Sequence, residues 1–286
     1  MGLFLQTWGK PLADRVQILS YERMFSGAPI NLPRGTYIFA SVRQAFGSYD
    51  PPSRERRMVA QLHDNLVQHY GPHHVLNDPL LSMRRLPMLR ILRERGINRF
   101  TAYPAGEIPR STRFPVFLRG ESGTKYDQPL LLRNHEEYQT ALAFEAPRPD
   151  LLAVEFCDTA DATGIYRKYG AFIVGERIVP RHLFFSREWM VKVADLTGPE
   201  QLAEELAYLE SNAHAETLLE VCKLANISYG RVDYALRQGR VQVWEINISP
   251  AVVLSSGTHD DVRHGVHERF TKLFAAALDA IEIGTA

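Results

Sequence analysis

Two stretches near the C-terminus decide the fold: Ser228-Tyr-Gly-Arg-Val-Asp-Tyr-Ala-Leu236 and Val241-Gln-Val-Trp-Glu-Ile-Asn-Ile248. Both have the length of a strand, are rich in β-branched and aromatic residues, and flank a turn around Gln238-Gly239. This pattern predicts a β-hairpin. Glu245 and Asn247 are two residues apart, so their side chains leave the same face of their strand.

The length of the hairpin loop decides whether Asp233 joins these two side chains. A three-residue loop at Gln238-Gly-Arg240 would set Asp233 opposite Glu245, whereas a two-residue turn would send it to the other face. Carboxylates buried among apolar neighbours are costly without a partner, and a hard cation is a natural one. We therefore predict a Mg²⁺ site at Asp233, Glu245 and Asn247, with water and phosphate filling the remaining positions. The alternative is an exposed charged hairpin face.

The first part of the chain alternates between strand and helix patterns. Residues 1–34 show no pattern that assigns a structure. From there to residue 112, the alternation predicts a small parallel α/β domain. Its expected elements are a strand from Gly35, a helix over Arg54–Tyr70, a short strand over Val75–Pro79 and a helix over Leu80–Arg95 that Gly96 ends.

The second part of the chain contains more strands. We expect a strand over Phe114–Arg119, a turn over Gly120–Thr124, a helix over Asn134–Phe144 with an Asn cap, and a strand over Leu151–Phe156. A hairpin of Tyr169–Val174 and Arg177–Phe185, a helix in two pieces around Ser211-Asn212, and a C-terminal helix over residues 261–281 complete the prediction.

The two C-terminal stretches together resemble the signature of the ATP-grasp superfamily, which includes glutathione synthetase and D-alanine:D-alanine ligase. In that family an acidic pair and an Asn hold the magnesium ions on ATP, so the resemblance implies this role for Asp233, Glu245 and Asn247. It also implies the fold class: α/β, with a small parallel pre-ATP-grasp domain over 35–112 followed by a two-lobed ATP-grasp domain with antiparallel sheets. The two lobes would span 113–157 and 158–286. Residues 1–34 would form an N-terminal extension before the small domain.

The resemblance extends upstream to the expected nucleotide contacts. Arg119 stands where the family has a basic strand residue that touches phosphate, and Gly120 and Gly123 stand in the position of its glycine-rich loop. Residues Glu155, Phe156 and Cys157 are similar to the hinge that holds adenine and ribose. The family usually has Lys where this chain has Arg119, whose planar guanidinium changes the geometry of phosphate binding. Two glycines are fewer than many members carry in this loop.

Further basic residues are candidates for contacts with phosphate. The resemblance implies a catalytic contact at Lys168, with Arg167 as the alternative, and another at Arg181, while Lys192 is a further nucleotide contact. For each, the alternative is a solvated surface charge. The arginines between Arg84 and Arg119 are interpreted as a solvated helix face, although they are also compatible with an anionic substrate.

The function that the resemblance implies is a Mg-ATP-dependent ligase, which joins a small-molecule carboxylate to an amine through an acyl phosphate. A small-molecule kinase on the same fold and a nucleotide-binding regulatory module are the alternatives. The 33 basic and 33 acidic residues cancel, so no global field draws the chain to nucleic acid or to a membrane. Two distant cysteines, Cys157 and Cys222, fit a cytoplasmic protein. The sequence leaves a homodimer open.

Overall fold

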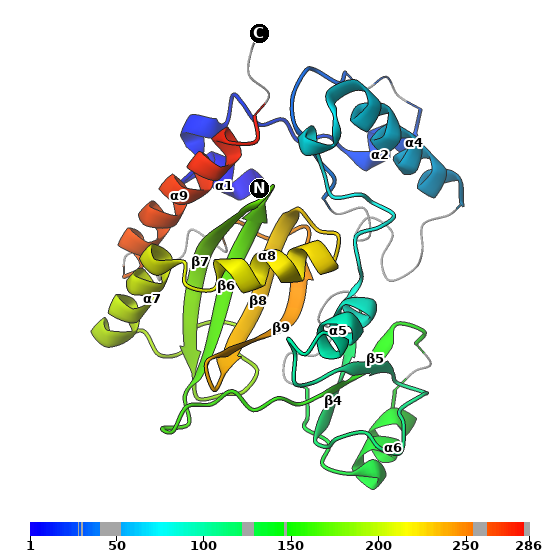
Figure 1. The fold of residues 1–286 in the computed structure, drawn as a ribbon, viewed down its shortest axis with the longest axis vertical. Coiled ribbons are helices and arrows are strands. Elements are labelled where there is room, and N and C mark those ends of the chain that lie inside the picture. Colours follow the sequence, from blue (N-terminus) through cyan, green and yellow to red (C-terminus); the bar gives the residue numbers. More distant parts are fainter. Residues whose placement is uncertain are drawn as a thin grey trace.

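The structure, a computed structural model, describes residues 1–27, 29, 31–40, 53–121, 129–145, 148–253 and 262–282. Within them it contains a parallel two-stranded sheet, an antiparallel three-stranded sheet and an antiparallel four-stranded sheet. The predicted fold class is confirmed, since a small parallel part is followed by two lobes that are each built on an antiparallel sheet (Figure 1).

The small parallel part consists of β1 (Tyr37–Ile38), α4 (Ser53–Tyr70), the short 3₁₀ helix η2 (Pro72–His74) and β2 (Val75–Leu76). The strands pair in parallel as predicted. Buried Phe39, Val59 and Leu66 form its own small core, and the helix α2 (Tyr21–Phe25) packs against this core. Apolar residues at helical spacing on α4 explain this packing, because they form one stripe that must be covered.

The three-stranded sheet has the order β3-β5-β4, with β3 at Ala102–Pro104, β4 at Val116–Gly120 and β5 at Leu151–Glu155. The helix α6 (His135–Ala143) begins at the predicted cap, where the Asn134 side chain accepts a hydrogen bond from the Glu137 amide at 2.9 Å. Because β3 precedes residue 113, this sheet draws residues from both sides of the domain boundary expected there. The domain boundaries themselves stay predictions.

The four-stranded sheet has the order β7-β6-β8-β9 and contains the hairpin that decides the fold. Its strands are β6 (Tyr166–Val174), β7 (Arg177–Ser186), β8 (Tyr229–Arg237) and β9 (Arg240–Asn247). Helices α7 (Pro199–Ser211) and α8 (Ala215–Leu224) lie across one face (Figure 1). The predicted break between them is confirmed at Asn212, whose φ of 43° is left-handed and ends α7. The opposite face carries the charged residues described below.

The hairpin reaches the predicted register by a different route from the one expected. Arg237 pairs with Arg240, so the turn contains only two residues, and both have positive φ as a type I′ turn requires. The prediction of a three-residue loop is therefore wrong. A β-bulge at Trp244 adds one residue to β9, and Asp233 lies opposite Glu245 after all. The bulge restores the face that the short turn would have reversed.

The N-terminal residues, which the sequence left unassigned, pack against the C-terminal helix α9 (His264–Asp279). Helix α1 (Gly2–Gln6) lies beside α9 in Figure 1, and the rings of Phe4 and Phe274 meet edge to face with centroids 5.6 Å apart. The short 3₁₀ helix η1 (Lys10–Leu12) follows α1. Arg15 also forms ion pairs with Asp279 and Glu282. The two ends of the described chain thus stabilise each other.

One helix differs from its predicted span. The helix expected over Leu80–Arg95 is α5 (Arg85–Glu94), since the Asp78 carboxylate accepts the amides of Leu80 and Leu81 and holds them in a turn.

In the part of the chain that the structure describes, no helix has the length and apolar character needed to cross a membrane.

Candidate functional site

The face of the four-stranded sheet opposite α7 and α8 holds the predicted carboxylates in neighbouring positions. Asp233 on β8 is 8% exposed and is opposite Glu245 on β9. The Arg231 guanidinium binds Asp233 through two nitrogens, with Nε 2.7 Å from Oδ1 and Nη2 3.2 Å from Oδ2. The Lys168 ammonium lies 3.1 Å from the same carboxylate. Asp233 therefore has a cation from its own strand and one from β6.

Glu245 is held by two arginines that come from outside the four-stranded sheet. Arg85 at the start of α5 lies 2.8 Å from its Oε1, and Arg119 near the end of β4 lies 3.4 Å from its Oε2. The three-stranded lobe and the four-stranded lobe thus meet at this carboxylate. Of the two arginines, the sequence predicted only Arg119 as a site residue.

Arg85 also ties α5 to the end of β4. Its guanidinium donates to the backbone carbonyls of Gly120 at 2.6 Å and Glu121 at 2.8 Å. Glu121 in turn accepts the amide of Leu86 in the first turn of α5 at 3.3 Å, a favourable place for a carboxylate. Arg85 is buried, so the interpretation of its basic stretch as a solvated helix face is wrong for this residue. The sequence shows only a cluster of arginines here, and this pattern does not distinguish Arg85 from its exposed neighbours.

Positive charge exceeds negative charge in this cluster. The carboxylates of Asp233 and Glu245 face the cations of Lys168, Arg231, Arg85 and Arg119, which leaves a surplus of two positive charges. Burial would raise the pKa of both carboxyl groups, but their cationic neighbours hold each pKa below its ordinary value. Burial, followed by the charge of Arg85, lowers the pKa of Arg119 to about 10. Both carboxyl groups and Arg119 are therefore charged near neutral pH.

The arrangement suits a polyanion that brings its own cation. A bare Mg²⁺ would add to the positive surplus, whereas a triphosphate would neutralise it and share the ion with the carboxylates. Asn247 lies opposite Arg231 in the ladder, and its Oδ1 accepts the Ser249 amide at 2.9 Å. Among the described residues, no three His, Cys, Asp or Glu side chains gather as a metal site. The predicted set supplies two carboxylates and one amide oxygen to a cation that phosphate would also bind, and its role as a metal site stays a prediction.

Two buried nitrogens mark where further acceptors would fit. The Nε atoms of Arg85 and Arg119 are inaccessible to solvent and have no hydrogen-bond partner among the described residues. Buried donors of this kind are usually satisfied, so each points to a group that binds here or to a rearrangement on binding.

The basic residues predicted on β6 and β7 divide between different surroundings. Lys168 reaches Asp233, whereas Arg167 pairs with Glu204 on α7 at 2.8 Å, so Lys168 is the one that lies in the cluster. Arg181 is buried and contacts the segment after β9 and the helix α9. Its Nε donates to the Val252 carbonyl at 2.9 Å, and its guanidinium lies over the Phe270 ring. This geometry fixes the segment that follows β9.

The predicted hinge residues lie at the end of β5, apart from the charge cluster. Glu155 is buried with its carboxylate 2.7 Å from the Arg113 guanidinium and 3.1 Å from the Tyr103 hydroxyl. Its charge is thus neutralised inside its own lobe. Cys157 is buried too, and burial raises the pKa of its thiol, so it packs as a small apolar side chain.

The other nucleotide contacts expected from the sequence are placed as follows. Gly120 ends β4 beside Arg119, and Gly123 lies outside the described residues. Lys192 is half-buried in the segment between β7 and α7. In the same segment the Trp189 ring lies 5.0 Å from Phe117 on β4 and 5.4 Å from Phe156 at the end of β5, measured between centroids. This segment therefore bridges the two lobes.

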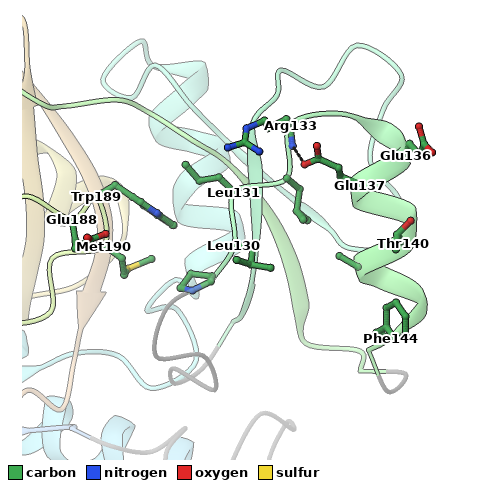
Figure 2. A pocket seen from close by; sticks show the side chains of 13 residues that line it. Leu130, Leu131, Arg133, Glu136, Glu137, Thr140, Phe144, Glu188, Trp189 and Met190 are labelled. Carbon is green, nitrogen blue, oxygen red and sulfur yellow. Dashed lines mark hydrogen bonds between the residues drawn. The ribbon is translucent and has the colours of Figure 1, made fainter. Parts of the chain in front are cut away.

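A pocket of about 780 Å³ lies between Trp189 and the helix α6 (Figure 2). Figure 2 shows Trp189 and Met190 on one side of it and the helix α6 on the other, with Leu130 and Leu131 between them. Arg133, Glu136 and Glu137 also line it. None of its lining residues belongs to the ion pairs of Asp233 and Glu245, so this pocket is separate from the charge cluster.

Comparison with known proteins gives solved structures of similar shape, whereas no protein-family model and no curated protein sequence matches the chain. D-alanine–D-alanine ligase from Bacillus anthracis is 16% identical over 78% of this chain and 76% of that one, with a TM-score of 0.46. Its complex with ATP gives 14% identity over 78% and 74%, with a TM-score of 0.45. L-amino acid ligase from Bacillus licheniformis gives 12% over 77% and 53%, with a TM-score of 0.44. With every TM-score below 0.5, these similarities carry no functional assignment.

Proposed function

We propose that this protein is a magnesium-dependent, ATP-using ligase of the ATP-grasp type, which joins a carboxylate to an amine. The observation that carries the proposal is the cluster of two adjacent carboxylates and four cations, which both lobes contribute. A surplus of two positive charges beside two oxygen ligands is complementary to a metal-bound triphosphate. The resemblance of the β8–β9 hairpin to the ATP-grasp signature supports the same assignment.

On this proposal, the ion pairs of the free protein exchange partners when ATP binds. Mg²⁺, held by Asp233, Glu245 and Asn247, would withdraw charge from the phosphate oxygens. The carboxylates would then release their guanidinium and ammonium partners, which turn to the phosphates as donors. Arg119 would approach from the three-stranded lobe, Arg85 from α5, and Lys168 and Arg231 from the four-stranded lobe. The protein would contribute positioning and electrostatic stabilisation rather than covalent chemistry.

The reaction would proceed in two steps. A substrate carboxylate oxygen attacks the γ-phosphorus of ATP, the bond to the bridging oxygen breaks, and ADP leaves with the electron pair. An amine then attacks the acyl carbon of the acyl phosphate, inorganic phosphate leaves, and the amine loses a proton to give an amide. Cations around the γ-phosphate stabilise the charge that develops in the first step.

Trapping of the acyl phosphate tests this proposal. With the acid substrate, Mg-ATP and hydroxylamine in place of the amine, we expect a hydroxamate. Addition of the amine should divert the product to an amide, with one ADP and one phosphate released for each bond formed. Release of ADP with a stable phosphorylated product would instead indicate a kinase. Absence of ATP turnover with every acid and amine screened would indicate a nucleotide-binding module.

A further inference from the structure

A single row of residues crosses the four-stranded sheet at the level of the carboxylates. His182 on β7 pairs with Gly170 on β6, Gly170 pairs with Asp233 on β8, and Asp233 pairs with Glu245 on β9. Residues that pair in this way project from the same face of a sheet. The row therefore places a histidine two strands away from Asp233, a Cα separation of about 10 Å at the usual strand spacing.

The imidazole of His182 lies over Gly170 in this row. A Cβ atom built on Gly170 would be 2.3 Å from its Cε1 atom and 2.5 Å from its Nε2 atom, so the ring occupies the space that any other residue would fill. The ring stacks on Phe184, with centroids 4.1 Å apart and planes inclined by 13°. The glycine thus allows the ring to extend from β7 over β6.

The far nitrogen of this ring is buried and has no partner. His182 is 3% exposed, and its Nε2 atom has no hydrogen-bond partner among the described residues. A buried polar atom of this kind is rare in native structures, because its desolvation is not compensated. It therefore marks a place where a group with complementary hydrogen-bonding character would bind.

The surroundings decide what that group is. Burial, followed by the charges of Arg231, Lys168, Arg181 and Arg263, lowers the pKa of His182 far below its ordinary value, so the ring is neutral. Ligands attracted by these cations are anions, whose oxygens are acceptors only. An imidazole nitrogen complements such an oxygen when it carries the proton. The tautomer with the proton on Nε2 is therefore the one that can donate a hydrogen bond to an anion at this site.

We propose that His182 is an additional phosphate-binding residue of this site, whose Nε2–H donates to an oxygen of the phosphoryl group that Lys168 and Arg231 hold. The inference rests on the proposed function. Lys168 lies two residues from Gly170 on the same face and is bound to Asp233 in the free protein. When Asp233 turns to the metal ion, Lys168 is released, and the phosphoryl group reaches both its ammonium and the ring beside it.

A neutral donor adds affinity for the phosphoryl group without adding to the positive surplus. A fifth cation would bind free phosphate more tightly and would repel its neighbours when the site is empty. The competing explanation is that His182 only fills space between Phe184 and Gly170. The two explanations differ in whether the nitrogen or the ring shape matters.

Four variants separate these explanations. His182→Phe keeps the stack on Phe184 and removes Nε2, whereas His182→Gln keeps a neutral N–H donor and loses the stack. Gly170→Ala displaces the ring, because the new methyl group would overlap it. Phe184→Leu is the matched control, since it changes the packing around the ring and leaves its nitrogen in place. Circular dichroism and thermal unfolding establish that each variant folds.

The probe is inorganic phosphate, titrated by calorimetry into the protein saturated with Mg-ADP. For His182→Phe and Gly170→Ala we expect phosphate affinity to fall about tenfold, the loss of one hydrogen bond to an anion. The Gln variant should recover most of that loss, and Phe184→Leu should stay close to wild type. Equal phosphate affinity in wild type and His182→Phe would overturn the inference, as would a loss in the Gln variant as large as in the Phe variant.

Nitrogen NMR of ¹⁵N-histidine-labelled protein gives a readout that packing alone would not change. We expect the proton of His182 on Nε2, and a shift of this resonance when phosphate is added to the Mg-ADP complex. A proton on Nδ1 in the phosphate complex would overturn the inference. If the wild-type protein fails to bind Mg-ADP, both the proposed function and the role of His182 are overturned. If it binds Mg-ADP but the complex does not bind phosphate, only the role of His182 is overturned.

Discussion

The charge cluster and the end of β5 both contain a buried carboxylate held by arginine, yet they differ in balance. Glu155 faces one arginine, Arg113, from its own lobe, and their charges cancel. Asp233 and Glu245 face four cations from both lobes, and two positive charges are left over. A balanced pair is complete in itself, whereas a surplus of one sign calls for a ligand of the other. Excess charge, rather than ion pairing, distinguishes the candidate site.

The largest expected effect comes from removing one carboxylate in each region. Asp233→Asn should lower ATP turnover on the order of 10³-fold, because the metal-bound phosphates lose a ligand and the positive charge becomes unbalanced. The measurement is the rate of ADP release with saturating Mg-ATP. Glu155→Gln is the matched change in the balanced pair, and we expect turnover near that of wild type. Similar losses in both variants would remove the distinction between the two regions.

A smaller effect is expected from the arginines. Arg119→Ala should raise the KM for ATP roughly tenfold through loss of a charge-assisted contact, and Arg119→Lys should recover part of it if charge alone matters. Arg85→Ala should behave like Arg119→Ala. Arg113→Ala, the equivalent change in the balanced pair, provides the control. A Lys variant as poor as Ala would show that the planar guanidinium is needed, and an Ala variant like wild type would place Arg119 outside the site.

The smallest expected effect concerns stability and pH. The pKa of Asp233 in the folded state lies below its ordinary value of 3.8, so its ion pairs stabilise the protein above that pH. This stabilisation is lost as the pH falls through the lower, folded-state pKa. The difference in Tm between wild type and Asp233→Asn should therefore be constant from pH 7 to about 5 and shrink below 3.8. A difference that persists unchanged to pH 2.5 would contradict the assigned ion pairs.

The sequence predicted the hairpin and the opposition of Asp233 and Glu245, but for a reason that the structure does not share. Alternation of apolar residues and the Gln-Gly turn are local signals, and they identify the strands correctly. The bulge at Trp244 restores the register after a two-residue turn, and no local pattern announces it. Trp244 stacks on Phe100, with ring centroids 5.2 Å apart, so its placement depends on a distant part of the chain.

The residues that the sequence missed are those whose role depends on contacts far along the chain. Arg85 reaches Glu245 across 160 positions, and composition shows only that it belongs to a basic stretch. Arg231 is part of the quoted motif, but the sequence assigned it no role. Its spacing from Asp233 does not reveal that the Arg231 guanidinium binds the Asp233 carboxylate through two nitrogens. The pairing of Glu155 with Arg113 is likewise visible only in three dimensions, and its assignment to the nucleotide stays a prediction.

The most direct test of the central claim, that the surplus charge binds a nucleotide together with its metal ion, is the affinity for ATP with and without Mg²⁺. Calorimetry on wild type and Glu245→Gln, each with Mg²⁺ or with EDTA, provides it. We predict that wild type binds ATP more tightly with Mg²⁺, and that Glu245→Gln loses most of this dependence while still binding free ATP through its cations. Wild-type affinity that is the same in Mg²⁺ and in EDTA would contradict the account.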